Sequence, residues 1–294
     1  MNIVIEIYLL EELAVFSKAG TLAKTAEQLN VTQPTVTRGM QKLEDEFGVQ
    51  LFDRQPNRIA LTETGKLAAQ EAVALMLANQ QLIDKVQNFD QSQRTIQIGS
   101  VLPGPLILLR NSLKQPAQNF QIATTLTSPA HTESLLSTNT YTGIISNKAL
   151  STSDIGSQYL GTEILAVNLD KFMYHANQSS VSFSELKGLS FIVLDDIGPW
   201  RQIIQQEIPD AKFLYQAQRD AFAEITKYSD FPYFSTKLSR TDATFFEQFD
   251  NDDNRIRIPI SDQNAHMKIY FNYLKKQKQR VEPIISQIQQ IWPV

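Results

Sequence analysis

A short stretch near the N-terminus carries amide, hydroxyl and cationic side chains at the spacing of one helix face. Such side chains donate and accept hydrogen bonds at fixed geometry, which is what reading base edges in a DNA major groove requires. A solvated helix surface has a similar composition, so both interpretations stand at this point. The residues of this polar face are Gln33, Thr35, Thr37, Arg38, Gln41 and Lys42.

The sequence around the polar face predicts a helix that presents it. Thr32 can cap a helix starting at Gln33, and Pro34 is tolerated in a first helical turn. Apolar residues then recur at steps of four, three and four, which predicts one buried stripe on the opposite side. The residues of the stripe are Val36, Met40, Leu43 and Phe47.

Two further helices are predicted before this one. An apolar stripe from Leu9 to Phe16 indicates a first helix that ends near Gly20. Thr21 can cap the second helix, in which the small Ala26 permits close approach of its neighbour. The tight link at residues 30–32 then completes a helix-turn-helix pattern, with Thr32 as a candidate contact to DNA.

Strand-like runs at residues 49–54 and 58–61 surround a turn and predict a small β-hairpin, or wing. Arg54 and Arg58 on this hairpin are candidates for contacts with flanking phosphates. Thr62 can cap a long helix that runs to about Phe89, followed by a polar linker at residues 90–94. Its apolar seam predicts a dimer, with packing on its own chain as the alternative. The seam consists of Leu75, Leu82, Val86 and Phe89.

From residue 95 onward, short β-like runs alternate with helical ones, which favours an α/β domain with parallel strands. A strand-like run at 267–271 and a closing amphipathic helix end the sequence. Examples of the earlier strand-like runs lie at residues 95–101, 120–126, 143–145, 164–168, 190–194 and 255–260.

The N-terminal motifs closely resemble the DNA-binding domain of LysR-type transcriptional regulators. The resemblance is carried, in order and spacing, by the run from Phe16 to Arg38 and by the motifs Lys42-Leu43-Glu44, Phe47-Gly48-Val49, Leu51-Phe52-Asp53-Arg54 and Leu61-Thr62-Glu63-Thr64-Gly65.

This resemblance implies an N-terminal winged helix-turn-helix at residues 1–61 and a long linker and dimerisation helix at 62–94. It also implies a two-lobed α/β effector domain at 95–294 that is similar to periplasmic binding proteins. Lobe I would comprise residues 95–161 and 267–294, and lobe II residues 162–266. The implied partners are double-stranded promoter DNA, a second copy of the chain in a homodimer or homotetramer, and RNA polymerase as a further candidate.

The resemblance also implies an unknown small-molecule effector in the cleft between the lobes. By order along the chain, the cleft would be lined by Ser100, Val101, Leu102, Ser128, Asp195, Trp200 and Phe231. An ordinary surface loop is the alternative for each position. Phe231 belongs to the bulky segment 225–233, where many family members have a glycine-rich one, so the ligand is expected to be small, unusual or absent.

Ligand binding would act by population shift between arrangements of the lobes, with crossings near residues 161–163 and 261–266 as hinges. Two alternatives remain open at this stage. One is a regulator with a degenerate cleft that acts without a ligand. The other is a solute-binding or enzymatic module with secondary DNA binding.

Composition narrows the classes of function. The chain has no cysteine and only three histidines, and no motif brings a nucleophile, base and metal ligands together. We therefore expect no catalytic residues, no metal and no cofactor. No stretch reads as a membrane anchor or a secretory signal, so a cytoplasmic location is expected. The net charge of −4 argues against a protein that coats nucleic acid indiscriminately.

Overall fold

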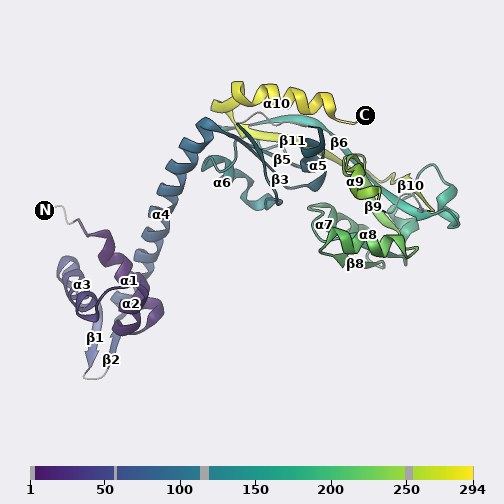
Figure 1. Cartoon of the computed structure of the whole chain (residues 1–294). Coiled ribbons are helices and arrows are strands. Elements are labelled where there is room, and N and C mark those ends of the chain that lie inside the picture. The colour runs from purple at the N-terminus through teal and green to yellow at the C-terminus, as the bar shows by residue number, and fades with distance from the viewer. Residues whose placement is uncertain (1–3, 56–57, 113–118, 249–253, 294) are drawn as a thin grey trace. The chain divides into compact units, whose positions relative to one another are not determined.

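The computed structural model describes residues 4–55, 58–112, 119–248 and 254–293. The chain divides into two compact units, Met1–Gln87 and Asn88–Val294. None of the helices within these ranges is long and apolar enough to cross a membrane. The elements of each unit are labelled in Figure 1.

Unit 1 begins with three helices, α1 (Ile7–Ala19), α2 (Leu22–Gln28) and α3 (Gln33–Phe47). The predicted caps are confirmed, because Thr21 and Thr32 each accept a hydrogen bond from a backbone N–H of the first turn. Gly20 and Gly48 end α1 and α3 in the left-handed conformation. These helices surround a core that includes Leu9, Leu13, Val36, Met40 and Leu43.

Phe47 departs from the predicted buried stripe, since it is 40% exposed. It is the last residue of α3, where the chain turns away at Gly48. The predicted hairpin is confirmed as β1 (Phe52–Gln55) and β2 (Arg58–Leu61), which pair antiparallel. Residues 56–57 of its turn lie outside the described residues.

The long helix α4 (Glu63–Arg94) starts at the predicted cap, where Thr62 Oγ1 accepts from the N–H of Gly65 at 2.9 Å. The interpretation of residues 90–94 as a linker is wrong, because α4 continues through them. An ion pair one turn apart, Asp90 to Arg94 at 2.8 Å, supports this last part of the helix.

Unit 2 is built on one nine-stranded sheet that two lobes share. In lobe I, three parallel strands, β4 (Phe120–Ile122), β3 (Ile96–Ser100) and β5 (Gly143–Ser146), continue into the antiparallel β11 (His266–Leu274). The long β6 (Ile155–Asp170) pairs with β11 through its first part and enters lobe II with its second. Figure 1 shows β6 running between the two lobes. The hinge predicted at residues 161–163 therefore lies inside a continuous strand.

Lobe II places β9 (Tyr233–Thr236), β7 (Ser190–Leu194) and β8 (Lys212–Gln216) parallel to one another, with β9 and β10 (Arg255–Pro259) antiparallel to β6. The sheet is thus mixed rather than parallel, because β6, β10 and β11 run against their neighbours. The helices of unit 2 are α5 (Pro103–Ser112), α6 (Thr132–Ser137), α7 (Trp200–Glu207), α8 (Arg219–Lys227), α9 (Ala243–Phe246) and α10 (Lys278–Ile291).

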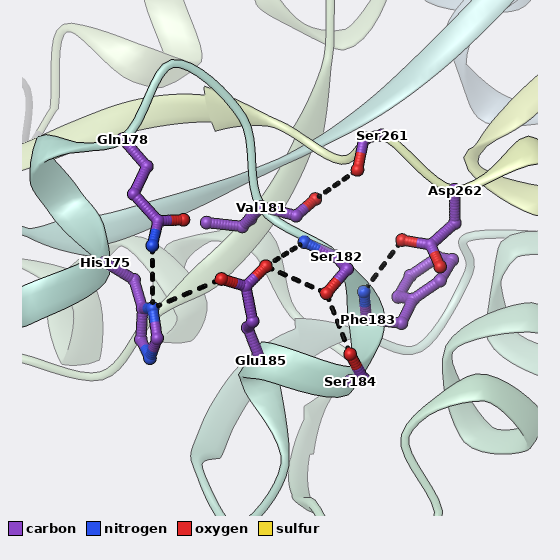
Figure 2. Close-up of polar contacts among 9 residues, drawn as sticks. All are labelled: His175, Gln178, Val181, Ser182, Phe183, Ser184, Glu185, Ser261 and Asp262. Carbon is purple, nitrogen blue, oxygen red and sulfur yellow. Dashed lines mark hydrogen bonds and ion pairs between the residues drawn. The ribbon is translucent and has the colours of Figure 1, made fainter.

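Side-chain hydrogen bonds fasten the start of the second crossing to lobe II (Figure 2). Asp262 accepts from the N–H of Phe183 at 2.8 Å, and the Ser261 hydroxyl donates to the carbonyl of Val181 at 3.3 Å. Glu185 in turn accepts from the N–H of Ser182 at 2.7 Å. The hinge predicted at residues 261–266 thus begins with residues that are hydrogen-bonded to lobe II, and Asn264 also donates to Glu207 of α7 at 2.6 Å.

Candidate DNA interface and inter-lobe cavity

The predicted polar face of α3 lies at the surface of unit 1. Gln33, Thr35, Arg38, Gln41 and Lys42 are exposed, and Thr37 is half-buried. The opposite side of the same helix is fixed by its buried apolar stripe. The rotation of α3 is therefore set by its core side, which leaves the polar side available.

Some groups on this face already bind their own helix. The Thr37 hydroxyl donates to the carbonyl of Gln33 at 3.0 Å, and the Thr32 and Thr35 hydroxyls share a hydrogen bond of 2.8 Å. Arg38 is exposed and donates from Nε to the carbonyl of Pro34 at 3.3 Å. These hydroxyls therefore support the first turn of α3, whereas most of the Arg38 guanidinium remains available.

Two of the residues predicted to contact phosphates or bases form ion pairs within the protein. Lys42 pairs with Glu6, and Arg54 Nη2 lies 2.9 Å from Glu44 Oε2. Partial burial alone would raise the pKa of Glu44. The hydrogen bonds that Glu44 accepts from Arg54 and from backbone N–H groups outweigh this effect, so the pKa is lowered. The Lys42–Glu6 pair is exposed and therefore weak, so a phosphate can compete for Lys42. The Arg54–Glu44 pair is less exposed on its carboxylate side. Arg58 lies opposite Gln55 in the hairpin, and its side chain lies outside the described part of the structure.

One buried carboxyl group behind the interface was not predicted. Glu12 on α1 is 5% exposed, and its Oε2 has no hydrogen-bond partner. It packs against Gly39 of α3, where any side chain would collide with the carboxyl group. Burial, with a smaller effect of Glu11, raises the pKa of Glu12 to about 7.

The seam of α4 is exposed in the single chain. Leu82 is 61% exposed and Val86 is 62% exposed, and Leu75 and Phe89 are also exposed. Large apolar side chains repeated along one face are typical of a helix that packs against a partner.

A cavity of about 280 Å³ lies between the two lobes of unit 2. Lobe I contributes the start of α5, and lobe II contributes the end of β7 and parts of β9 and α8. Asp195 and Trp200, both predicted for the cleft, are among its lining residues. Glu163 on the crossing strand β6 also lines it, although the sequence interpretation placed this residue only in a hinge.

The other predicted cleft residues are distributed differently. Val101 and Ser128 line a second, neighbouring cavity. Ser100 is fully buried, and its Oγ accepts from the N–H of Leu102 at 3.0 Å and donates to the carbonyl of the same residue at 2.8 Å. Leu102 is also fully buried, and Phe231 packs on an aromatic cluster of lobe II. The lining of these two cavities does not include Ser100, Leu102 or Phe231.

A single signal in the sequence could have identified Glu163. It is a carboxylate within the otherwise apolar run from Leu160 to Val167, apart from Thr162 beside it. In the part of the chain that the structure describes, no group of three or more His, Asp or Glu residues is arranged to hold a metal ion.

Comparison with known proteins gives one family match and several related regulators. Residues 8–66 match the family model "Bacterial regulatory helix-turn-helix protein, lysR family". The probable cat1 operon transcriptional activator of Acinetobacter lwoffii is 31% identical over 110 residues, which are 36% of this chain and 36% of that protein. The regulator BenM of Acinetobacter baylyi is 30% identical over 105 residues, 35% of this chain and 34% of its own length. The chain thus matches about a third of the length of these relatives.

Solved structures resemble the whole chain in fold. The structure of Vibrio fischeri DarR in complex with DNA superimposes with a TM-score of 0.54 at 18% identity, covering 98% of this chain and 100% of that one. Full-length OxyR from Pseudomonas aeruginosa gives a TM-score of 0.51 at 16% identity, covering 97% of this chain and 94% of that one. At such identities the likeness establishes the winged helix-turn-helix, long helix and two-lobed domain as a shared fold.

Proposed function

The chain belongs to the LysR family of bacterial transcriptional regulators, and from this premise we propose that it binds promoter DNA through α3 and alters that binding when a small molecule occupies the cavity between its lobes. The observation that supports the DNA-binding part is the exposed amide and guanidinium face of α3, held outward by a buried stripe. The hydrogen-bonding capacity of Gln33, Arg38 and Gln41 fits the acceptors and donors of base edges.

The proposal includes self-association through α4. Its exposed seam of Leu75, Leu82, Val86 and Phe89 suits a second copy of the same helix. A dimer presents two recognition helices, and the distance between them sets which paired half-sites are bound. A ligand that prefers one arrangement of the lobes could then change this spacing, which is a population shift.

The DNA-binding part is tested with Arg38→Ala in the full-length protein. If Arg38 reads a base, the variant loses about 1–3 kcal/mol of binding to the cognate operator and little binding to random DNA. A gel-shift titration on the upstream DNA of its own operon, against a scrambled duplex, measures both affinities.

Lys85→Ala is the matched control. It removes the same charge from an exposed position of α4, about 33 Å along the helix from Glu63. Both affinities are expected to stay at the wild-type level in this variant. An equal loss of affinity on both duplexes for Arg38→Ala would assign Arg38 to phosphate contacts. If the wild-type protein did not bind the operator duplex more tightly than the scrambled one, operator binding would be refuted.

A further inference from the structure

The inter-lobe cavity is mainly apolar, and three charged residues of its lining are engaged elsewhere, whereas Asp196 also lines it. Arg219 pairs with Asp242 at 2.7 Å, and Asp195 lies 3.4 Å from Arg201. Arg110 donates to the carbonyl of Ala123. The fully buried polar groups of the lining lie where β6 and the start of α7 meet.

Two polar groups at that depth lack partners. Glu163 is 2% exposed, and its Oε1 accepts from the Thr236 hydroxyl at 2.6 Å, but its Oε2 has no hydrogen-bond partner. Trp200 is 3% exposed, and its indole Nε1 has no partner either. The indole lies near enough to favour the charged form of Glu163, yet the two groups do not meet in hydrogen-bond geometry.

The backbone makes room for this arrangement. Gly104 in the first turn of α5 lies against Glu163 Oε1, and any side chain at this position would collide with the carboxylate. Lobe I thus reaches the carboxylate through a glycine, and lobe II reaches it through Thr236 and Trp200. Buried polar groups are nearly always paired, so an unpaired donor and an unpaired acceptor on one cavity wall indicate a missing partner.

We propose that this cavity binds an uncharged, largely apolar small molecule through a hydroxyl group, which accepts from Trp200 Nε1–H and donates to Glu163 Oε2. This inference rests on the proposed function, because it names the chemical class of the ligand for the same cavity. A hydroxyl is both donor and acceptor, whereas an ammonium group leaves the indole without an acceptor. A carboxylate would bring a second negative charge against Glu163.

Size and protonation agree with this class of ligand. A cavity of about 280 Å³ suits a small ligand rather than a large one. Burial raises the pKa of Glu163 to about 7, against the lowering effect of Thr236 and Trp200. Above that pH the carboxylate accepts from the hydroxyl, and below it the hydroxyl can accept from the neutral carboxyl group.

Calorimetric titration of the full-length protein at pH 8 tests the proposal with four probes that share one ring: benzyl alcohol, benzoate, benzylamine and toluene. Benzyl alcohol is expected to bind at least roughly tenfold more tightly than the other three, since only it satisfies both groups. Glu163→Gln and Trp200→Phe are each expected to weaken its binding by about tenfold, because the first replaces the carboxylate by a neutral amide and the second removes the indole N–H donor.

Glu224→Gln is the matched control, since this carboxylate is exposed on α8. Its affinity for benzyl alcohol should equal that of the wild type. Tighter binding of benzoate, benzylamine or toluene, no binding of any probe, or unchanged affinity in a folded Glu163→Gln or Trp200→Phe variant would each overturn the hydroxyl assignment. The gel shift on operator DNA reports separately on the proposed function, so it distinguishes a wrong ligand class from a wrong regulator.

Discussion

At the scale of single residues, the two units each bury a carboxyl group whose pKa is raised to about 7, Glu12 in unit 1 and Glu163 in unit 2. Burial is the main cause in both. They differ in their surroundings, because Glu163 lines a cavity and Glu12 is packed between two helices. The unpaired oxygen of Glu163 therefore can meet a ligand, whereas that of Glu12 is a cost to folding.

The pH dependence of stability should reveal Glu12. Below pH 4.5 the carboxyl group is protonated in both states, and between 4.5 and about 7 the unfolded chain releases the proton while the folded one retains it. The free energy of unfolding of unit 1 therefore falls as the pH rises through this window, by on the order of 1–3 kcal/mol.

Glu12→Gln should remove this slope and make unit 1 more stable than the wild type at pH 8. Urea unfolding at pH 5 and pH 8 measures the effect. Glu27→Gln, an exposed carboxylate on α2, serves as the control and should retain the wild-type slope. An unchanged slope in Glu12→Gln would mean that the Glu12 carboxyl group titrates normally in the folded protein.

At the scale of elements, α3 and α4 expose different kinds of surface. The open side of α3 is polar, which suits nucleic acid, and the open side of α4 is a line of leucine, valine and phenylalanine side chains. Burying one leucine side chain contributes about 1.5–3 kcal/mol, so two copies of the α4 seam can supply a stable helix pair.

The double variant Leu82→Asp with Val86→Asp should dissociate the oligomer, because it places charges in the apolar seam. Its dissociation constant should rise by at least roughly 100-fold, as lost burial of this size implies. Sedimentation velocity over a range of concentrations measures the change. Gln81→Asp, at a neighbouring exposed position, should sediment like the wild type. An oligomer that survives the double substitution would place the interface elsewhere.

At the scale of the whole molecule, the two units have separate cores that share no residue. Leu43 is fully buried in unit 1, and Phe191 is fully buried in unit 2. Leu43→Ala should destabilise unit 1 by about 2–5 kcal/mol, and Phe191→Ala should destabilise unit 2 by about 3–5 kcal/mol. Differential scanning calorimetry should show each variant lowering a different transition. A single transition lowered by both would show that the chain unfolds as one cooperative body.

Features that depend on residues close together in the sequence were predictable, and features that depend on distant residues were not. The helix-turn-helix followed from threonine caps, a proline and stripes at helical spacing, all of which act between residues a few positions apart. The same local signals misplaced the end of α4, because a polar stretch can be a linker or an exposed helical turn. They gave no bounds for β8 and β9, which pair with β7 and β6.

The amino-acid sequence alone determined the position, rotation and chemical character of α3, since caps and periodicity within about fifteen residues decide them. Only the tertiary structure decided the inter-lobe cavity. Glu163, Trp200, Thr236 and Gly104 are far apart along the chain and meet because β6 crosses between the lobes. Burial then changes the chemistry of a carboxyl group that any sequence pattern would treat as an ordinary surface acid.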